Sequence, residues 1–165
     1  MRKSFAICAG AVFLVLSACA PTQKVDLEAE KAQVKKVVDQ IEQAMEAEDV
    51  ELISTVVAHD ADMVNFGTDA AERWVGWEDL EAAVDQQFAA FDNQQVSVRD
   101  QVIKVASGGM VAWFSEIMDW NLEAGGEMVS LEGMRATGVL EKRNGKWIIV
   151  QMHFSVGVAG QAAEY

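Results

Sequence analysis

The sequence predicts an α+β fold in which N-terminal helices pack on a curved antiparallel sheet. Apolar residues recur every three or four positions through much of the first half, which is the spacing of a helix face. From Val96 onward, apolar and polar residues alternate, as they do in strands that bury one face. Glycine pairs and an Asn-Gly pair divide this second half at intervals that suit the turns of a meander. Helices followed by a run of strands indicate the α+β class.

The first half is expected to contain three helices and one short strand. A helix begins at Leu27, and Asp49 can cap a second helix, since an aspartate side chain accepts hydrogen bonds from first-turn amides. Residues 61–66, "ADMVNF", are typical of a short strand. Residues 76–92 predict a third helix, whose apolar face consists of Leu80, Ala83, Val84, Phe88 and Phe91.

The second half predicts four strands, at about 95–106, 110–122, 128–142 and 146–157. The turns between them contain Gly108-Gly109, Gly125-Gly126 and Asn144-Gly145.

The last of these turns allows two pairings. A two-residue turn would place Arg135 and Thr137 on the face of Met152 and Phe154, which is an unfavourable place for a guanidinium. A three-residue loop from Arg143 to Gly145 shifts the pairing by one and so exchanges the faces. We favour this loop because it gathers polar side chains on one face, where Arg135, Thr137 and Val139 lie together with Gln151, His153 and Ser155.

The N-terminus is typical of an export signal. Arg2 and Lys3 precede a short apolar run and then small residues, and the run is shorter than the roughly 20 residues of a membrane span. "LSAC", which ends at Cys19, resembles the lipobox of bacterial lipoproteins. The resemblance implies cleavage after residue 18 and a lipid anchor on Cys19, with an ordinary signal peptide as the alternative. Ala20 stands where an aspartate would imply inner-membrane retention, so we expect the outer membrane, facing the periplasm.

The expected domains are a signal peptide, 1–18, a lipidated cysteine and tether, 19–29, one globular domain, 30–157, and a tail, 158–165. Cys8 leaves with the leader and Cys19 is lipidated, so we expect no disulfide in the mature chain. Loss of the two basic leader residues takes the net charge from −13 to −15. Such a charge argues against nucleic-acid binding, because it repels phosphate.

Three stretches carry a resemblance to a known family: "RWVGWEDL", "VAWFSEIMDW" and "EGMRATGVLEKRNGKWIIVQMHFS". With the predicted order of elements, they resemble the SnoaL-like branch of the nuclear transport factor 2-like superfamily over about residues 30 to 157. The resemblance implies a cone-shaped, cystatin-like fold whose curved sheet and helices enclose a pocket. The superfamily includes isomerases, cyclases, hydrolases and assembly domains, so the fold does not select a function.

The resemblance further implies that the polar face of the last hairpin is concave and lines the pocket. The convex face would then join a homodimer through Ile148, Val150, Met152 and Phe154. The alternatives are that His153 and Ser155 form a structural hydrogen-bonded pair, and that Arg135 neutralises a buried Glu116 or Glu132. The candidate pocket residues are Trp77, Trp113, Glu116, Arg135, Thr137, Gln151, His153 and Ser155.

These patterns favour an envelope lipoprotein that binds a small, largely apolar molecule without established catalysis. One alternative is a cyclase-like or hydrolase-like enzyme, with Glu116 or Asp119 as the base and Arg135 or His153 as the electrophilic partner. Isomerase chemistry that needs a tyrosine donor is disfavoured, because the single tyrosine is Tyr165. Another alternative is an oligomerising or envelope-protein interaction module. No cofactor is expected, and a metal site from His59, Asp60 and Asp62 is disfavoured by their spacing.

Overall fold

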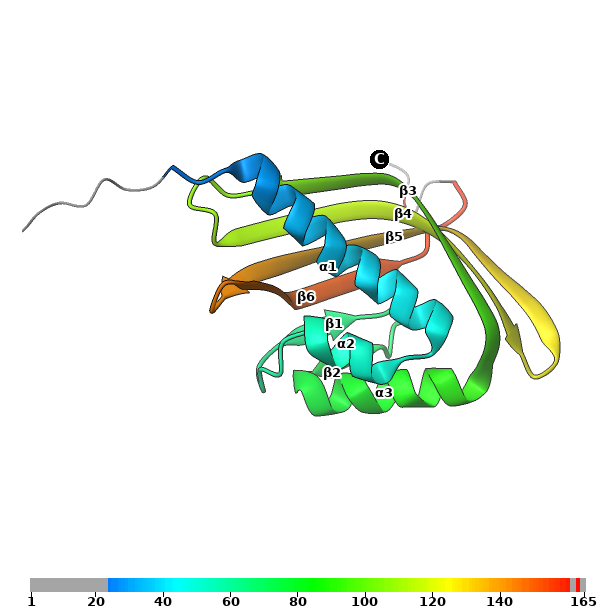
Figure 1. The fold of residues 1–165 in the computed structure, drawn as a ribbon. Coiled ribbons are helices and arrows are strands. Elements are labelled where there is room, and N and C mark those ends of the chain that lie inside the picture. The colour runs from blue at the N-terminus through cyan, green and yellow to red at the C-terminus, as the bar shows by residue number, and fades with distance from the viewer. Residues whose placement is uncertain (1–23, 161–162, 164–165) are drawn as a thin grey trace, which may run out of the picture.

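The computed structural model describes residues 24–160 and residue 163. The predicted signal peptide and Cys19 therefore lie outside the described residues. Three helices and one curved six-stranded sheet form the α+β fold that the sequence predicted (Figure 1). Within the described residues, no helix has the length and apolar character required to cross a bilayer.

Aspartate caps begin the first two helices. Helix α1, Leu27–Ala47, starts after Asp26, whose carboxylate accepts from the amides of Glu28 and Ala29. Helix α2, Val50–Val56, starts after Asp49, whose Oδ1 accepts from the Leu52 amide at 2.9 Å. The predicted Asp49 cap is confirmed.

The segment around the third helix differs from the prediction in two ways. A short strand that the sequence did not indicate, β2, Arg73–Val75, precedes the helix and pairs with β1, Val64–Phe66. Helix α3, Gly76–Ala90, ends before Phe91, where the chain passes directly into a strand. Phe91 was predicted to be helical because it continues the apolar face of α3.

The remaining strands form the predicted meander of β3, Phe91–Val105, β4, Val111–Ala124, β5, Glu127–Arg143, and β6, Lys146–Ser155. The sheet order is β2-β1-β6-β5-β4-β3, and β1 runs parallel to β6. Helix α1 crosses the sheet, while β3 curves toward the end of α3 (Figure 1). Because the sheet is curved, α3, the end of β4 and the start of β5 surround the same cavity.

The final turn contains two residues, so the predicted three-residue loop is wrong. Arg143 pairs with Lys146, and both Asn144 and Gly145 have positive φ angles, of 52° and 81°. These angles are characteristic of a type I′ turn, whose twist matches that of the strands it joins.

The predicted sharing of a face farther along the hairpin is nevertheless confirmed, because a β-bulge shifts the pairing by one residue, although in the direction opposite to that of the predicted loop. Leu140 pairs with Ile149, whereas Val139 pairs with Gln151, which leaves Val150 as the extra residue. Beyond the bulge, Thr137 pairs with His153 and Arg135 pairs with Ser155, whereas the three-residue loop would have paired Arg135 with His153. The four side chains still share one face, as predicted.

The hydrophobic core lies between α1 and one face of the sheet. The helix buries one stripe of apolar side chains, and the sheet supplies the opposite wall. Every second residue of the central strands is buried there, as expected when one face packs on a helix. The fully buried side chains in this layer include Val34, Val38, Met118, Leu122, Met134, Leu140 and Ile149.

Candidate functional site

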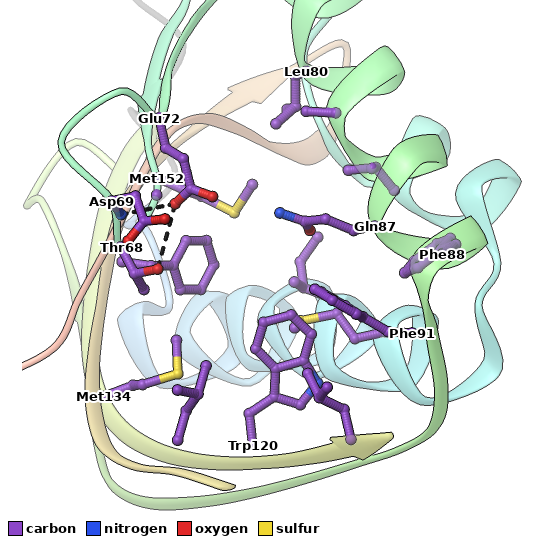
Figure 2. A pocket seen from close by; sticks show the side chains of 18 of the residues that line it. Thr68, Asp69, Glu72, Leu80, Gln87, Phe88, Phe91, Trp120, Met134 and Met152 are labelled. Carbon is purple, nitrogen blue, oxygen red and sulfur yellow. Dashed lines mark hydrogen bonds between the residues drawn. The ribbon is translucent and has the colours of Figure 1, made fainter. Parts of the chain in front are cut away.

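A cavity of about 340 Å³ lies between α3, the C-terminal half of α1, the β1–β2 loop and the inner face of the sheet (Figure 2). Most of its wall is apolar. Phe91 and Trp120 meet edge to face in this wall, with ring centroids 5.7 Å apart. The other large apolar lining residues are Trp74, Leu80, Val84, Phe88, Leu131, Met134, Met152 and Phe154.

Polar groups gather at one end of the cavity. Thr68, Asp69 and Glu72 come from the β1–β2 loop, and Gln87 comes from α3. Glu72 Oε2 accepts hydrogen bonds from Thr68 Oγ1 at 3.3 Å and from the Asp69 amide at 2.9 Å. Figure 2 shows the side chains of Glu72 and Gln87 pointing toward the same space from opposite walls. Among the described residues that line the cavity, there is no arginine, lysine or histidine.

Gly67 allows this loop to close on itself. A methyl group at Gly67 would overlap Glu72 Oε2 and would lie 2.6 Å from the Trp74 ring. Both side chains therefore lie directly over the glycine backbone, which a larger residue would prevent. The acidic group and one aromatic wall residue are positioned by the same turn.

The predicted polar pocket residues lie on the other face of the sheet. Arg135, Thr137 and His153 are exposed, whereas their neighbours Ala136 and Met152 are buried on the inner face. Gln151 and Ser155 share the outer face with them through the pairs of the last hairpin. The prediction that these polar residues line the pocket is therefore wrong. The reason is energetic, because the apolar face of the sheet is the one that packs against the helices.

The predicted dimer surface does not form one face. The bulge at Val150 places Ile148 on the outer side of the sheet and Met152 on the inner side. Met152 and Phe154 line the cavity. Homodimer formation stays a prediction, but Met152 and Phe154 are not available on an outer surface.

The two tryptophans that were predicted to line the pocket lie elsewhere. Trp77 is 8% exposed and stacks on His59, with ring centroids 4.3 Å apart. Trp113 is 48% exposed on the outer face of β4. The tryptophans in the cavity wall are Trp74 and Trp120.

The residues of the alternative catalytic scheme are not brought together. Glu116 is 6% exposed on the inner face, where Gln101 Nε2 donates to it at 2.9 Å. Arg135 and His153 lie on the opposite face. Asp119 accepts from the Gly133 amide and from Arg99, both at 2.7 Å, and these bonds lower its pKa. Neither Glu116 nor Asp119 lines the cavity.

Two side chains of the "HDAD" segment, His59 and Asp60, have structural partners. Asp60 accepts two hydrogen bonds from Arg143, at 2.8 and 2.7 Å, and these lower the pKa of Asp60. His59 Nε2 lies 3.1 Å from the Ser54 carbonyl oxygen. Throughout the described residues, no three acidic, histidine or cysteine side chains are arranged to hold a metal ion.

A partly buried acidic cluster between α1 and the sheet was not predicted. Burial raises the pKa of Glu42 to about 7, and the nearby charges of Glu116 and Asp39 add to the effect. Burial also raises the pKa of Glu116. Gln101 Nε2 bridges Asp39 and Glu116, at 3.3 and 2.9 Å. The cluster could not be predicted from the sequence, because the acidic residues of α1 are interspersed with lysines in the manner of a solvent-exposed helix face.

A family model for the SnoaL-like domain matches residues 34–159. No curated protein sequence matches the chain.

Solved structures share the fold at low sequence identity. A nuclear transport factor 2-like superfamily protein from Salmonella enterica has a TM-score of 0.74 at 14% identity, covering 84% of this chain and 98% of its own. A candidate dehydratase of the same superfamily from Streptomyces avermitilis has a TM-score of 0.72 at 17% identity, covering 80% and 99%. A protein with a cystatin-like fold from Caulobacter vibrioides has a TM-score of 0.67 at 10% identity, covering 79% and 91%.

Proposed function

We propose that this chain, which belongs to the family of SnoaL-like domains, binds a small, largely apolar molecule in the cavity between α3 and the sheet. The observation that carries the proposal is the wall itself: aromatic, leucine and methionine side chains surround about 340 Å³ of space. Apolar walls with a few polar groups at one end are characteristic of ligand pockets. Catalysis is not part of the proposal, because the predicted bases, Glu116 and Asp119, and their predicted partners do not line this cavity.

The binding proposal is tested with a neutral fluorescent naphthylamine probe, whose emission rises in an apolar site. The variant Ala83→Phe fills the cavity from α3, whereas Ala82→Phe places the same side chain at the exposed neighbouring position. We expect probe affinity to fall at least about tenfold in the first variant, which corresponds to about 1.4 kcal/mol, and to be unchanged in the second. Equal affinity in both variants would refute a binding site in this cavity.

We further propose that acylated Cys19 holds the domain to the outer membrane, on its periplasmic side. The support is the leader sequence and its "LSAC" motif. Metabolic labelling with a fatty-acid analogue tests the anchor: wild type should be labelled and Cys19→Ala should not. Separation of the membranes then tests the location, which recovery in the inner membrane would contradict.

A further inference from the structure

We propose that the cavity selects ligands whose polar end is a cation or a hydrogen-bond donor, such as a long-chain or aromatic amine, over carboxylates of equal size. This inference rests on the proposed binding function and names the ligand class. Its basis is the charge and hydrogen-bond inventory of the polar end of the cavity.

The charged groups at this end are the carboxylates of Asp69 and Glu72. The one basic residue on the adjoining strand, Arg73, pairs with Phe66. Phe66 in turn packs edge to face on His153, with centroids 5.7 Å apart, on the outer side of the sheet. Paired residues share a face of a sheet, so Arg73 lies on that outer side and does not neutralise the cavity.

Two donors of the loop are already used by the carboxylate of Glu72. Thr68 Oγ1 and the Asp69 amide both donate to Glu72 Oε2, which fixes the carboxylate. Within the described residues, the other oxygen, Glu72 Oε1, makes no hydrogen bond. A carboxylate oxygen accepts and does not donate, so this end of the cavity presents an acceptor to a ligand.

The remaining polar groups do not reverse this preference. Gln87 offers both a donor and an acceptor, so it serves either kind of ligand. The indole N–H of Trp120 is buried and covered, so a ligand does not reach it without displacing side chains. Trp74, whose ring lies over Gly67 as Glu72 does, adds an aromatic surface, which attracts cations.

The physical consequence is discrimination by charge. An ammonium group beside Glu72 forms an ion pair in surroundings that are less polar than water, which strengthens the attraction. A carboxylate at the same place meets two acidic side chains and no neutralising base, so it is repelled.

The experiment compares decylamine, decanol and decanoate, below their micelle concentrations, as competitors of the neutral naphthylamine probe on the full-length protein. We expect decylamine to bind at least about tenfold more tightly than decanoate, with decanol between them. Glu72→Gln should bring decylamine to the level of decanol and leave decanol unchanged. The matched control, Glu51→Gln, removes one exposed charge from α2 and should preserve the order.

The competitors separate this inference from the proposed function. Failure of all three to displace the probe would refute binding of such molecules in the cavity. If decanol displaces the probe as well as decylamine does, or if decanoate displaces it better, the charge preference is overturned and the binding proposal stays intact. Two outcomes would overturn the role of Glu72 and assign the preference for decylamine to the overall charge of −13. One is that Glu51→Gln reduces the preference as much as Glu72→Gln does, and the other is that moderate salt abolishes the preference.

Discussion

Glu42 on α1 and Glu116 on β4 interact through the buried interface between the helix and the sheet. Burial and the charge of Glu116 raise the pKa of Glu42 from 4.5 to about 7. Glu116 is itself buried, and its pKa is raised for the same reason. Both carboxyl groups therefore favour the protonated form more strongly in the folded protein than in the unfolded chain.

This relationship predicts that stability falls as the pH rises. Between about 4.5 and 7 the folded state binds more protons than the unfolded state, so the free energy of unfolding decreases with pH. Because Glu42 is only half-buried, solvent screens part of the effect, and we expect a loss of about 1–2 kcal/mol.

Glu42→Gln should remove most of this dependence and stabilise the protein at neutral pH. Denaturant unfolding at pH 5 and pH 8 measures the effect, with the exposed Glu51→Gln as the control. A wild-type protein that becomes more stable over this interval would contradict the prediction.

Glu30 differs from Glu42 in that its contacts stabilise the charged carboxylate. Its carboxylate accepts from Lys142 at 2.6 Å and from the Trp147 indole at 2.9 Å, and these bonds lower its pKa. Glu30→Gln should cost about 1–3 kcal/mol, because Lys142 would lose its partner in a mostly buried position. Glu28→Gln is the matched control, since Glu28 pairs with Lys31 on the exposed side of the same helix.

Thermal melts of the two variants measure the difference. Glu28→Gln should lie within about 0.5 kcal/mol of wild type. Equal melting temperatures for both variants would show that the Glu30 contacts do not contribute to stability.

The Asn144-Gly145 turn predicts a position-specific requirement for glycine. Gly145 has a φ of 81°, so Gly145→Ala should destabilise the protein by about 1–2 kcal/mol. At Gly108, where a Cβ meets nothing within 4 Å and φ is not positive, alanine should change stability by less than about 0.5 kcal/mol. Denaturant midpoints decide the matter, and a similar loss at both sites would argue against a two-residue turn.

Periodicity was sufficient to predict most of the fold, because long elements repeat their pattern over several turns or strand pairs. It identified α1 and the four-stranded meander, while the residue type at position 49 identified the cap of α2. It missed β2, since three residues are too few to show alternation. It also extended α3 through Phe91, because an apolar side chain facing the cavity suits the end of a helix and the start of a strand equally well.

The site was harder to predict, because the face of a strand depends on a single residue of register. Thr137 and His153 share a face as predicted, although the bulge at Val150 rather than the turn places them there. Family resemblance assigned the polar face of the last hairpin to the pocket. In the structure, the apolar face that contains Met152 is buried and lines the cavity. The acidic end depends on Gly67 and Glu72 in a loop without periodicity, so it left no pattern to read.

Adjacent residues of β6 test this assignment of faces. Phe154 lines the cavity, and His153 is exposed on the outer side, 5.7 Å from the Phe66 ring. Phe154→Ala should weaken binding of the neutral naphthylamine probe severalfold and destabilise the protein by about 2–3 kcal/mol, since it removes apolar contacts beside the core. His153→Ala should leave both quantities nearly unchanged, because exposed side chains contribute little to either. Probe titration and denaturant unfolding of the two variants give the answer. Loss of binding in His153→Ala with retention in Phe154→Ala would restore the outer polar face as the site and exclude the cavity proposed here.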